Sequence, residues 1–164
     1  MICQLGTAEI PAILTVVNSA AVAYKGKIPS DVWKEPYMPE QELEREKQSG
    51  VQFYGYKQNS VLTAVMGIQP VRDVTLIRHA YVLPSWQRKG LGQKLLEHLL
   101  GLEVTHQVYV GTWEAAGWAV KFYEKNGFQL VSEAEKNRLL KTYWSISERQ
   151  VETSVVLKLK RQPK

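Results

Sequence analysis

The stretch LPSWQRKGLGQKLLEHLL, residues 83–100, begins as a turn and ends as an amphipathic helix. Two glycines, Gly90 and Gly92, lie between these parts, next to the basic pair Arg88-Lys89. The run before the stretch reads as a strand and stops at a proline, which has no N–H group to donate to a sheet. The sequence therefore predicts a strand, a glycine-rich turn and a helix in succession.

A glycine-rich turn before a helix is suited to binding an anion. The first four N–H groups of a helix have no acceptor inside the helix, and the helix dipole favours negative charge there. Gly90 and Gly92 have no Cβ atom that would hold an anion away from these amides. Arg88 and Lys89 add positive charge nearby. The stretch therefore predicts a site for a phosphate or pyrophosphate, with a plain connecting turn as the alternative.

Two well-known phosphate-binding motifs do not match this turn. A P-loop needs a serine or threonine directly after its lysine, but Leu95 follows Lys94 here. A dinucleotide-binding fingerprint needs a third glycine or an alanine, and that position is also Leu95. The residues around the turn must therefore identify its ligand.

The remaining chain divides into short strands and helices. Periodicities of two and of 3.6 residues distinguish the two kinds of element. We expect strands at 2–5, 73–84, 107–113, 128–134 and 152–160, and a hairpin over 51–71. We expect helices at 7–24, 40–50, 90–102, 114–126 and 135–144. A strand-helix-strand-helix-strand run in the centre predicts the α/β class.

Length and composition fit one globular domain. The 164 residues contain no repeat, low-complexity tract or linker, so we expect a single domain over 1–164. No apolar run has the length of a membrane span, and the first residues lack the basic region of a signal peptide. Cys3 is the only cysteine and excludes an intrachain disulfide. We therefore expect a cytoplasmic protein without a membrane partner.

The charge pattern narrows the choice of partners. A net charge of +5 favours anionic ligands. A nucleic-acid-binding surface would need a basic stripe interleaved with exposed aromatic residues, which this sequence lacks, so we expect no nucleic acid partner. His98, His106 and Cys3 do not have the spacing of metal ligands, so we also expect no metal.

Two motifs follow each other about thirty residues apart: Val82-x-Pro84 with Gln87-x-x-Gly90-x-Gly92, and Ala119-x-x-Phe122-Tyr123-x-x-x-Gly127-Phe128. In this order and at this separation they resemble the signature of the GNAT superfamily of N-acetyltransferases. That family has a strand with Val-x-Pro, then Gln/Arg-x-x-Gly-x-Gly/Ala, and about thirty residues later Ala-x-x-Phe-Tyr-x-x-x-Gly-Phe. The matching residues are Val82, Leu83 and Pro84, then Gln87, Arg88, Lys89, Gly90, Leu91 and Gly92, then Ala119, Phe122, Tyr123, Gly127 and Phe128. The resemblance covers about residues 60–130 at the level of motifs and more loosely the elements on either side.

The resemblance implies a fold and a co-substrate. The fold would be a GNAT-type α+β arrangement: a mixed, mostly antiparallel sheet of six to seven strands, about four to five flanking helices and a central splayed strand pair. The co-substrate would be acetyl-CoA. Its pyrophosphate would be held by the turn amides, which belong to Gln87, Arg88, Lys89, Gly90, Leu91, Gly92 and Gln93. Tyr81, Val82 and Leu83 would pair with the pantetheine arm, with Ala119 and Phe122 beside it. The Val82 amide would then polarise the thioester carbonyl.

The implied reaction transfers an acetyl group from a thioester to an amine. The amine must lose a proton to attack, and the departing thiolate must gain one. By resemblance, Tyr123 is the acid, and its alternative role is that of a core aromatic beside Phe122. His79 and Glu114 are the two candidate bases, with a water chain as the third alternative. Strict alternation places His79 on the opposite face from Val82, and a β-bulge would change this.

One position departs from the family pattern. Many relatives have an asparagine near the end of the strand at 107–113, and Trp113 occupies the equivalent region here. Trp113 and Trp118 could instead line the channel for the acetyl or pantetheine group, or they could pack in the core. We include Trp113 among the residues expected to bind the cofactor.

The amine acceptor is expected to bind over residues 18–58. This part contains six aromatic residues, Tyr24, Trp33, Tyr37, Phe53, Tyr54 and Tyr56, and its acidic residues include Asp31, Glu35, Glu40, Glu42 and Glu44. An aromatic pocket with carboxylates suits a cationic amine on a small molecule or a peptide. The alternative is an exposed charged helix over a core capped by aromatics. A non-catalytic acyl-CoA-binding module is the competing function, and a homodimer through the last strand would follow only by analogy.

Overall fold

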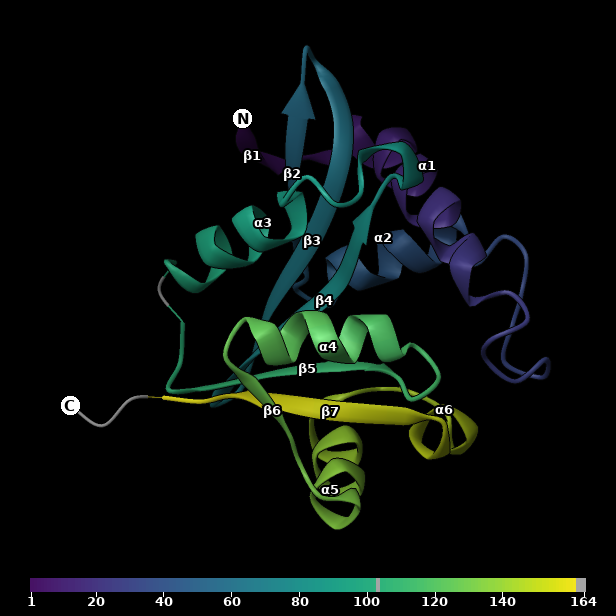
Figure 1. The fold of residues 1–164 in the computed structure, drawn as a ribbon, viewed down its shortest axis with the longest axis vertical. Helices are drawn as coiled ribbons and strands as arrows, with labels where there is room; N and C mark the ends of the chain where they lie inside the picture. The colour runs from purple at the N-terminus through teal and green to yellow at the C-terminus, as the bar shows by residue number, and fades with distance from the viewer. Residues whose placement is uncertain (103, 162–164) are drawn as a thin grey trace.

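The computed structural model describes residues 1–102 and 104–161, and its centre is one seven-stranded sheet (Figure 1). The strands are β1 (Ile2–Leu5), β2 (Gln52–Gln58), β3 (Val61–Val71), β4 (Val74–Val82), β5 (Gln107–Trp113), β6 (Phe128–Leu130) and β7 (Ser154–Leu159). Their order in the sheet is β1-β2-β3-β4-β5-β7-β6. Every neighbouring pair is antiparallel except β4 and β5, which are parallel. The expected mixed, mostly antiparallel sheet is confirmed.

The parallel pair separates part of the way along its length. β4 and β5 pair from Val74 with Gln107 to Ile77 with Val110, and no pairing follows although both strands continue. This is the central splayed pair that the sequence motifs implied. It leaves the second half of β4 with a free edge on the side of β5.

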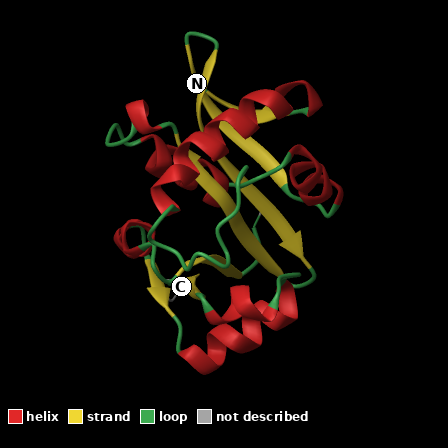
Figure 2. Ribbon diagram, turned by 90° about the vertical axis from the view of Figure 1, so that its right-hand side faces the viewer, coloured by secondary structure: helices red, strands yellow, loops and turns green. Residues whose placement is uncertain are grey.

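Helices cover both faces of the sheet (Figure 2). They are α1 (Ile10–Ala21), α2 (Glu40–Gln48), α3 (Leu91–Leu100), α4 (Gly117–Lys125), α5 (Glu133–Tyr143) and α6 (Glu148–Glu152), with 3-10 turns at Thr7–Glu9, Val22–Tyr24 and Pro84–Trp86. The apolar sides of α3 and α4 share one core cluster with β3, β4 and β5. Helices α1 and α2 form a second cluster on the other face, and α5 packs on β4, β5 and β7 in a third.

The described residues contain six α-helices, whereas four to five were expected. The additional helix is α6, whose five residues are too few to produce a recognisable periodicity. The Ser147 hydroxyl accepts a hydrogen bond from the Gln150 amide at 3.1 Å and caps this helix. The buried Lys136 ammonium donates to the Val151 carbonyl at 2.9 Å and joins α5 to α6. This pair of helices lies next to the site described below.

The segment Thr7–Tyr24 is long and apolar enough to pass a length-and-composition test for a membrane-crossing helix. Its buried residues are Ile10, Ile13, Val16, Val17, Ala20, Ala21 and Tyr24. Six of these seven belong to the helix α1, which contacts β3 and β4. The apolar character of this helix is therefore accounted for by its packing on the sheet.

A β-bulge interrupts the pairing of β3 with β4. Val65 pairs with Tyr81 and Gly67 with Arg78, so two residues of β3 span the same distance as three of β4. His79, inside the bulge, has a positive φ of 55°, a rare conformation for a residue other than glycine. The bulge turns both Arg78 and His79 toward α2.

The bulge does not bring His79 to the face of Val82. Ala80 and Val82 pack against the cluster of α3 and α4, whereas the His79 ring stacks on Phe53 on the other side. The bulge interrupts the alternation between Arg78 and His79, which both face α2. From His79 to Val82 the side chains again alternate between the two faces of the sheet. His79 therefore shares a face with Tyr81 rather than with Val82.

Gly67 permits the close approach of β3 and the bulge, and its replacement tests this feature. A Cβ atom at residue 67 would lie 2.8 Å from a Val51 methyl group and 3.0 Å from the Arg78 carbonyl oxygen. We expect Gly67→Ala to lower the free energy of unfolding by about 1–3 kcal/mol, because overpacking forces the strands apart. Urea denaturation would measure the loss. Gly6→Ala, where nothing lies within 4 Å, is the control, and equal stability of both variants would contradict the interpretation.

Candidate active site

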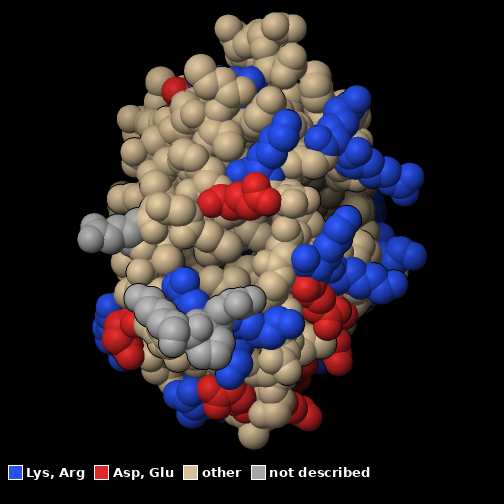
Figure 3. All heavy atoms as spheres, turned by 60° about the vertical axis from the view of Figure 1, so that its left-hand side comes forward, with Lys and Arg blue, Asp and Glu red and all other residues tan. Residues whose placement is uncertain are grey.

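The turn before α3 presents a row of free backbone amides. Gly90, in the left-handed conformation with φ of 77°, precedes the helix, and the Lys94 amide makes the first helical bond to its carbonyl. Within the described part of the chain, the amides of residues 88–93 have no intramolecular acceptor. Lysine and arginine side chains also gather on the right-hand side of the face in Figure 3. The turn thus has the geometry of an anion site.

The two glycines of the turn have different tasks. A Cβ atom at Gly90 would meet no neighbouring atom, but the positive φ at this position is unfavourable for any residue other than glycine. Gly92 has an ordinary φ, but a Cβ atom there would lie 3.3 Å from the Phe122 ring. Gly92 therefore allows α3 and α4 to approach each other beside the turn.

A cavity of about 490 Å³ extends from the turn into the gap beside β4. Its walls are β4 (Ala80, Tyr81, Val82), α4 (Ala119, Phe122, Tyr123) and the end of α1 with the following turn (Ala20, Ala23, Tyr24). Gln87 and Gly92 line the end nearest the turn. Six of the residues predicted to bind the cofactor therefore meet around one cavity: Tyr81, Val82, Gln87, Gly92, Ala119 and Phe122.

The backbone of β4 directs one amide into this gap. The Leu83 amide donates to the Thr63 carbonyl at 2.9 Å, and therefore points toward β3. Because successive N–H groups of a strand point to opposite edges, the Val82 amide faces the side that β5 has left. The Gln87 side chain donates to the Val82 carbonyl at 3.2 Å and holds the turn against the strand.

The remaining predicted cofactor residues lie around or away from the cavity. Arg88 and Lys89 are exposed on the turn, and Lys89 lies 5.8 Å over the Trp86 ring. The Leu91 side chain is buried in the core. Trp113 is not among the residues that line this cavity and instead lines the second cleft described below. Trp118 lines the cavity instead and stacks on Tyr24 at 6.0 Å.

A second cleft lies on the side of α2 and α6. It has two lobes of about 100 and 460 Å³ that share six lining residues: Tyr37, Arg78, His79, Trp113, Ile146 and Gln150. The Trp113 indole donates to the Tyr37 hydroxyl at 2.8 Å. Tyr24 and Tyr81 line both the smaller lobe and the first cavity, and their hydroxyl oxygens are 3.5 Å apart. These two tyrosines therefore separate two cavities that lie end to end.

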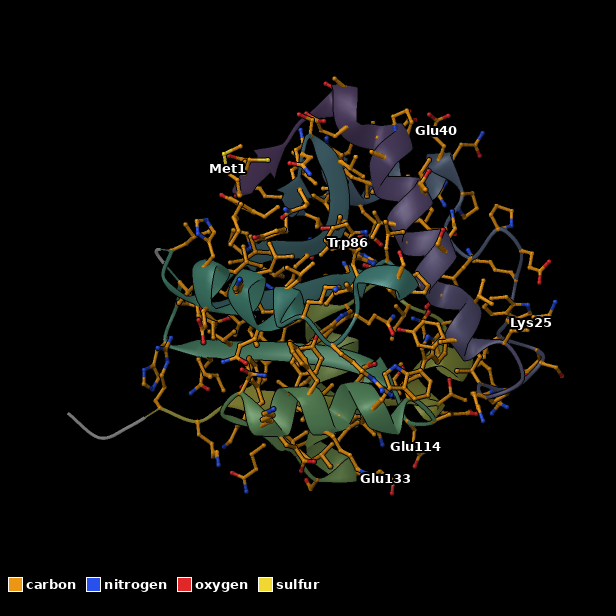
Figure 4. The ribbon with its side chains drawn as sticks, turned by 45° about the horizontal axis from the view of Figure 1, so that its top comes forward. Met1, Lys25, Glu40, Trp86, Glu114 and Glu133 are labelled. Atoms are coloured by element: carbon orange, nitrogen blue, oxygen red, sulfur yellow. The ribbon has the colours of Figure 1, made fainter. Side chains whose placement is uncertain are left out.

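His79 is the candidate base that lines this cleft. Its side chain is 14% exposed, and its Nε2 atom is buried without a hydrogen-bond partner in the described residues. Burial lowers the pKa of the imidazole below its ordinary value, so the ring is neutral at neutral pH. Glu114, the other candidate, is exposed beside the start of α4 and lines neither cavity (Figure 4). The geometry therefore brings His79, and not Glu114, to the cleft.

Tyr123 combines a core position with access to the first cavity. Its ring packs edge-to-face against Phe122 at 5.1 Å and Phe128 at 5.6 Å, and the residue is among those that line the cavity. Burial, and to a lesser extent the nearby Tyr24, raise the pKa of this phenol well above its ordinary value. Tyr123 therefore keeps its proton at neutral pH. Tyr123 is thus a buried core aromatic that also lines the first cavity, a position compatible with either of the two predicted roles.

Several lining residues have no recognisable signal in the sequence. Glu46 and Arg78 are charged residues within an amphipathic helix and an alternating strand, where charge ordinarily marks a solvated face. Gln150 lies in the unexpected helix α6, and its side chain makes no hydrogen bond to the described residues. Only the packing of α2 and α6 beside the bulge places these three side chains around one cleft.

His79 contributes to a pH-dependent stability whose sign follows from its burial. Because the unfolded chain takes up the proton more readily, stability should fall as the pH decreases through the ordinary histidine pKa of about 6.5. Thermal unfolding between roughly pH 7.5 and pH 5.5 should therefore show a falling Tm. His79→Gln should show a smaller slope. Parallel slopes for both proteins would contradict this assignment.

Comparison with known proteins places this geometry in a family. Residues 16–142 match the family model described as an acetyltransferase (GNAT) domain. A search of curated protein sequences finds no significant match. Solved structures share the fold at low identity. A GNAT-family acetyltransferase from Staphylococcus aureus Mu50 has a TM-score of 0.71, with 16% identity over 97% of both chains.

Two further structures have similar scores. The PaiA N-acetyltransferase from Thermoplasma acidophilum, solved in complex with coenzyme A, has a TM-score of 0.71 and 15% identity over 98% of both chains. The ribosomal-protein-S18-alanine N-acetyltransferase from Escherichia coli has a TM-score of 0.65 and 20% identity, covering 97% of this chain and 92% of its own. Because the family model covers well over half of the chain, including every residue that lines the first cavity, the chain belongs to the GNAT family of acetyltransferases.

Proposed function

We propose that this protein transfers an acetyl group from acetyl-CoA to a primary amine by direct attack. The observation that carries the proposal is the end-to-end arrangement of the two cavities, which meet at Tyr24 and Tyr81. One begins at the free amides before α3, and the other contains a neutral histidine. A thioester and an amine bound on either side of the tyrosines would meet beside β4.

In the proposed complex the cofactor occupies the cavity of 490 Å³. The amides of residues 88–93 hold the pyrophosphate, and the pantetheine arm pairs with the free edge of β4. The Val82 amide donates to the carbonyl oxygen as negative charge develops there. The related fold solved with coenzyme A supports this assignment.

The proposed mechanism contains two proton transfers, one from the acceptor amine and one to the leaving thiolate. His79 takes a proton from the acceptor ammonium, directly or through water, and the neutral amine attacks the acetyl carbon. The tetrahedral intermediate collapses, the carbon–sulfur bond breaks, and Tyr123 donates its proton to the leaving thiolate. Tyr123 carries this proton at neutral pH, so the proton is present as negative charge develops on the sulfur.

The cleft on the side of α2 and α6 is the proposed acceptor site. It combines aromatic walls, Tyr37 and Trp113, with charged and polar groups of α2 and α6. Such a lining suits an amine on a small molecule or at a peptide end. Because the related Escherichia coli structure is that of a ribosomal-protein-S18-alanine N-acetyltransferase, peptides are a rational part of the screen. We further propose that residues 1–164 work as one domain in the cytoplasm.

Acetyl-CoA should stabilise the protein by binding to the folded state. At about 100 times the dissociation constant, the gain should be roughly 2.7 kcal/mol, which corresponds to a rise in Tm of about 5–10 °C. Gly92→Val should show a smaller rise, because the added side chain meets Phe122. Gly117→Ala, where a Cβ atom has open space, is the control in the same helix pair. The absence of a shift with both acetyl-CoA and free CoA would refute the proposal.

The Tyr123→Phe variant tests whether Tyr123 acts as a general acid or only as a core aromatic. The variant keeps the ring packing, so we expect the dissociation constant of acetyl-CoA to change little. The turnover number should fall about 100-fold, as is typical when a general acid is removed. Steady-state measurement of thiol release would give both parameters, and unchanged turnover would remove Tyr123 from the mechanism.

A screen of amines by thiol release distinguishes an enzyme from a module that only binds acyl-CoA. Diamines, amino acids and short peptides with free N-termini represent the acceptors that the cleft could hold. Release of CoA with at least one amine supports catalysis. Binding of acetyl-CoA without release from any amine would favour the non-catalytic alternative.

A further inference from the structure

Glu46 on α2 lies against the bulge of β4. Its carboxylate accepts hydrogen bonds from the Arg78 guanidinium, at 2.9 Å from Nη1 to Oε2 and 3.4 Å from Nη2 to Oε1. Arg78 also donates to the Gln69 side-chain oxygen at 3.1 Å, and the Gln69 amide donates to the Ser49 carbonyl at 3.0 Å. The Glu46 side chain is 19% exposed. The carboxylate is therefore held in one orientation at the floor of the cleft.

The buried edge of His79 faces this carboxylate. Nε2 lies 3.7 Å from Glu46 Oε2, slightly longer than a hydrogen bond, and has no other partner among the described residues. Nδ1 makes no hydrogen bond to the described residues and is not fully buried. It is therefore accessible from the cleft that His79 lines. Hydrogen bonds of catalytic groups are often long before substrate binds. The arrangement favours the tautomer with its proton on Nε2.

We propose that Glu46 is a positioning residue that orients His79 through Nε2–H and leaves Nδ1 free to accept the proton of the acceptor amine. This inference rests on the proposed function, in which His79 is the base. When Nδ1 takes the proton, the ring becomes an imidazolium with N–H groups on both nitrogens. The amine gains its lone pair and attacks, and Glu46 remains ionised throughout.

Electrostatics explain why the base needs this carboxylate. Burial and the positive charge of Arg78 both oppose protonation of His79 and lower its pKa, while Glu46 and Glu42 on α2 counteract them. Burial alone would raise the pKa of Glu46, but His79 and Arg78 outweigh it and keep the pKa below its ordinary value. The other titratable or charged groups lining the cleft are Tyr24, Tyr37, Tyr81, Asp31, Lys34 and Arg149.

The backbone conformation of His79 also supports the proposal. A histidine with φ of 55° inside a strand is strained, and strained residues persist where the surrounding structure holds them. The stacking on Phe53 at 5.8 Å and the contact with Glu46 hold the ring from two sides. The surrounding structure therefore fixes both the backbone and the ring of His79 next to Glu46.

The first experiment uses the wild-type protein and needs no turnover. Nitrogen-15 NMR of the histidine rings at neutral pH reports which ring nitrogen carries the proton. The His79 signal is assigned by its absence from His79→Gln. We expect the proton on Nε2. A proton on Nδ1 would overturn the inference, whatever amines the enzyme accepts.

The second experiment compares Glu46→Gln with Glu42→Gln. Glu42 is the matched control because it is also on α2, lines the same cleft and pairs with Lys34 at 2.7 Å. In Glu46→Gln we expect the NMR titration of His79 and the acid limb of kcat/KM to move to lower pH together. We expect kcat to fall at least about tenfold, with the KM of the amine nearly unchanged. Glu42→Gln should move these quantities much less.

Three outcomes distinguish the inference from the function on which it rests. An active Glu46→Gln enzyme with an unmoved His79 titration overturns the inference alone. If Glu46→Gln does not fold, Glu46→Asp keeps the charge and should retain the Nε2–H tautomer, and the Nδ1–H tautomer there would overturn the inference. A wild type that releases no CoA with any amine refutes the proposed function, and the NMR arms still decide the pairing of Glu46 with His79.

Discussion

β4 pairs with β5 only as far as Ile77 and Val110, and the bulge on β4 begins at the next residue. The separation of these two parallel strands creates the first cavity, because a half-strand without a partner leaves polar backbone groups and open volume beside it. The bulge creates the floor of the second, because it turns Arg78 and His79 to the same face. Both cavities thus originate from one irregularity in the centre of the sheet.

The ion pairs of the second cleft differ in how far they are buried. Asp31 with Arg149 and Lys34 with Glu42 form ion pairs near its rim, where solvent screens them and the side chains can rearrange. Glu46 with Arg78 forms a pair at the floor, where both side chains are less than 20% exposed. Removing one partner there would leave a buried charge. The floor is therefore rigid, while the rim can adapt to an acceptor.

The aromatic residues couple the two cavities. Tyr24 contacts Tyr81 edge-to-face at 6.2 Å, and Tyr37 contacts both rings. Burial raises the pKa of all three hydroxyls, so the partition stays uncharged at neutral pH. An uncharged partition places no ionised group between the two cavities. In the proposed reaction, the acceptor amine would lose its proton beside a wall that does not itself ionise.

The sequence by itself determined the class of fold, the glycine turn and the position of Tyr123, because these depend on local periodicity, on missing Cβ atoms and on a short motif. It also included His79 among the candidates, but it contained no signal that Trp113, Glu46, Arg78 and Gln150 line the same cleft as His79. Only the tertiary structure decided these positions. A bulge changes the facing of a strand by one residue, and the packing of α2 and α6 joins side chains about 30 to 100 positions apart, which no local pattern encodes.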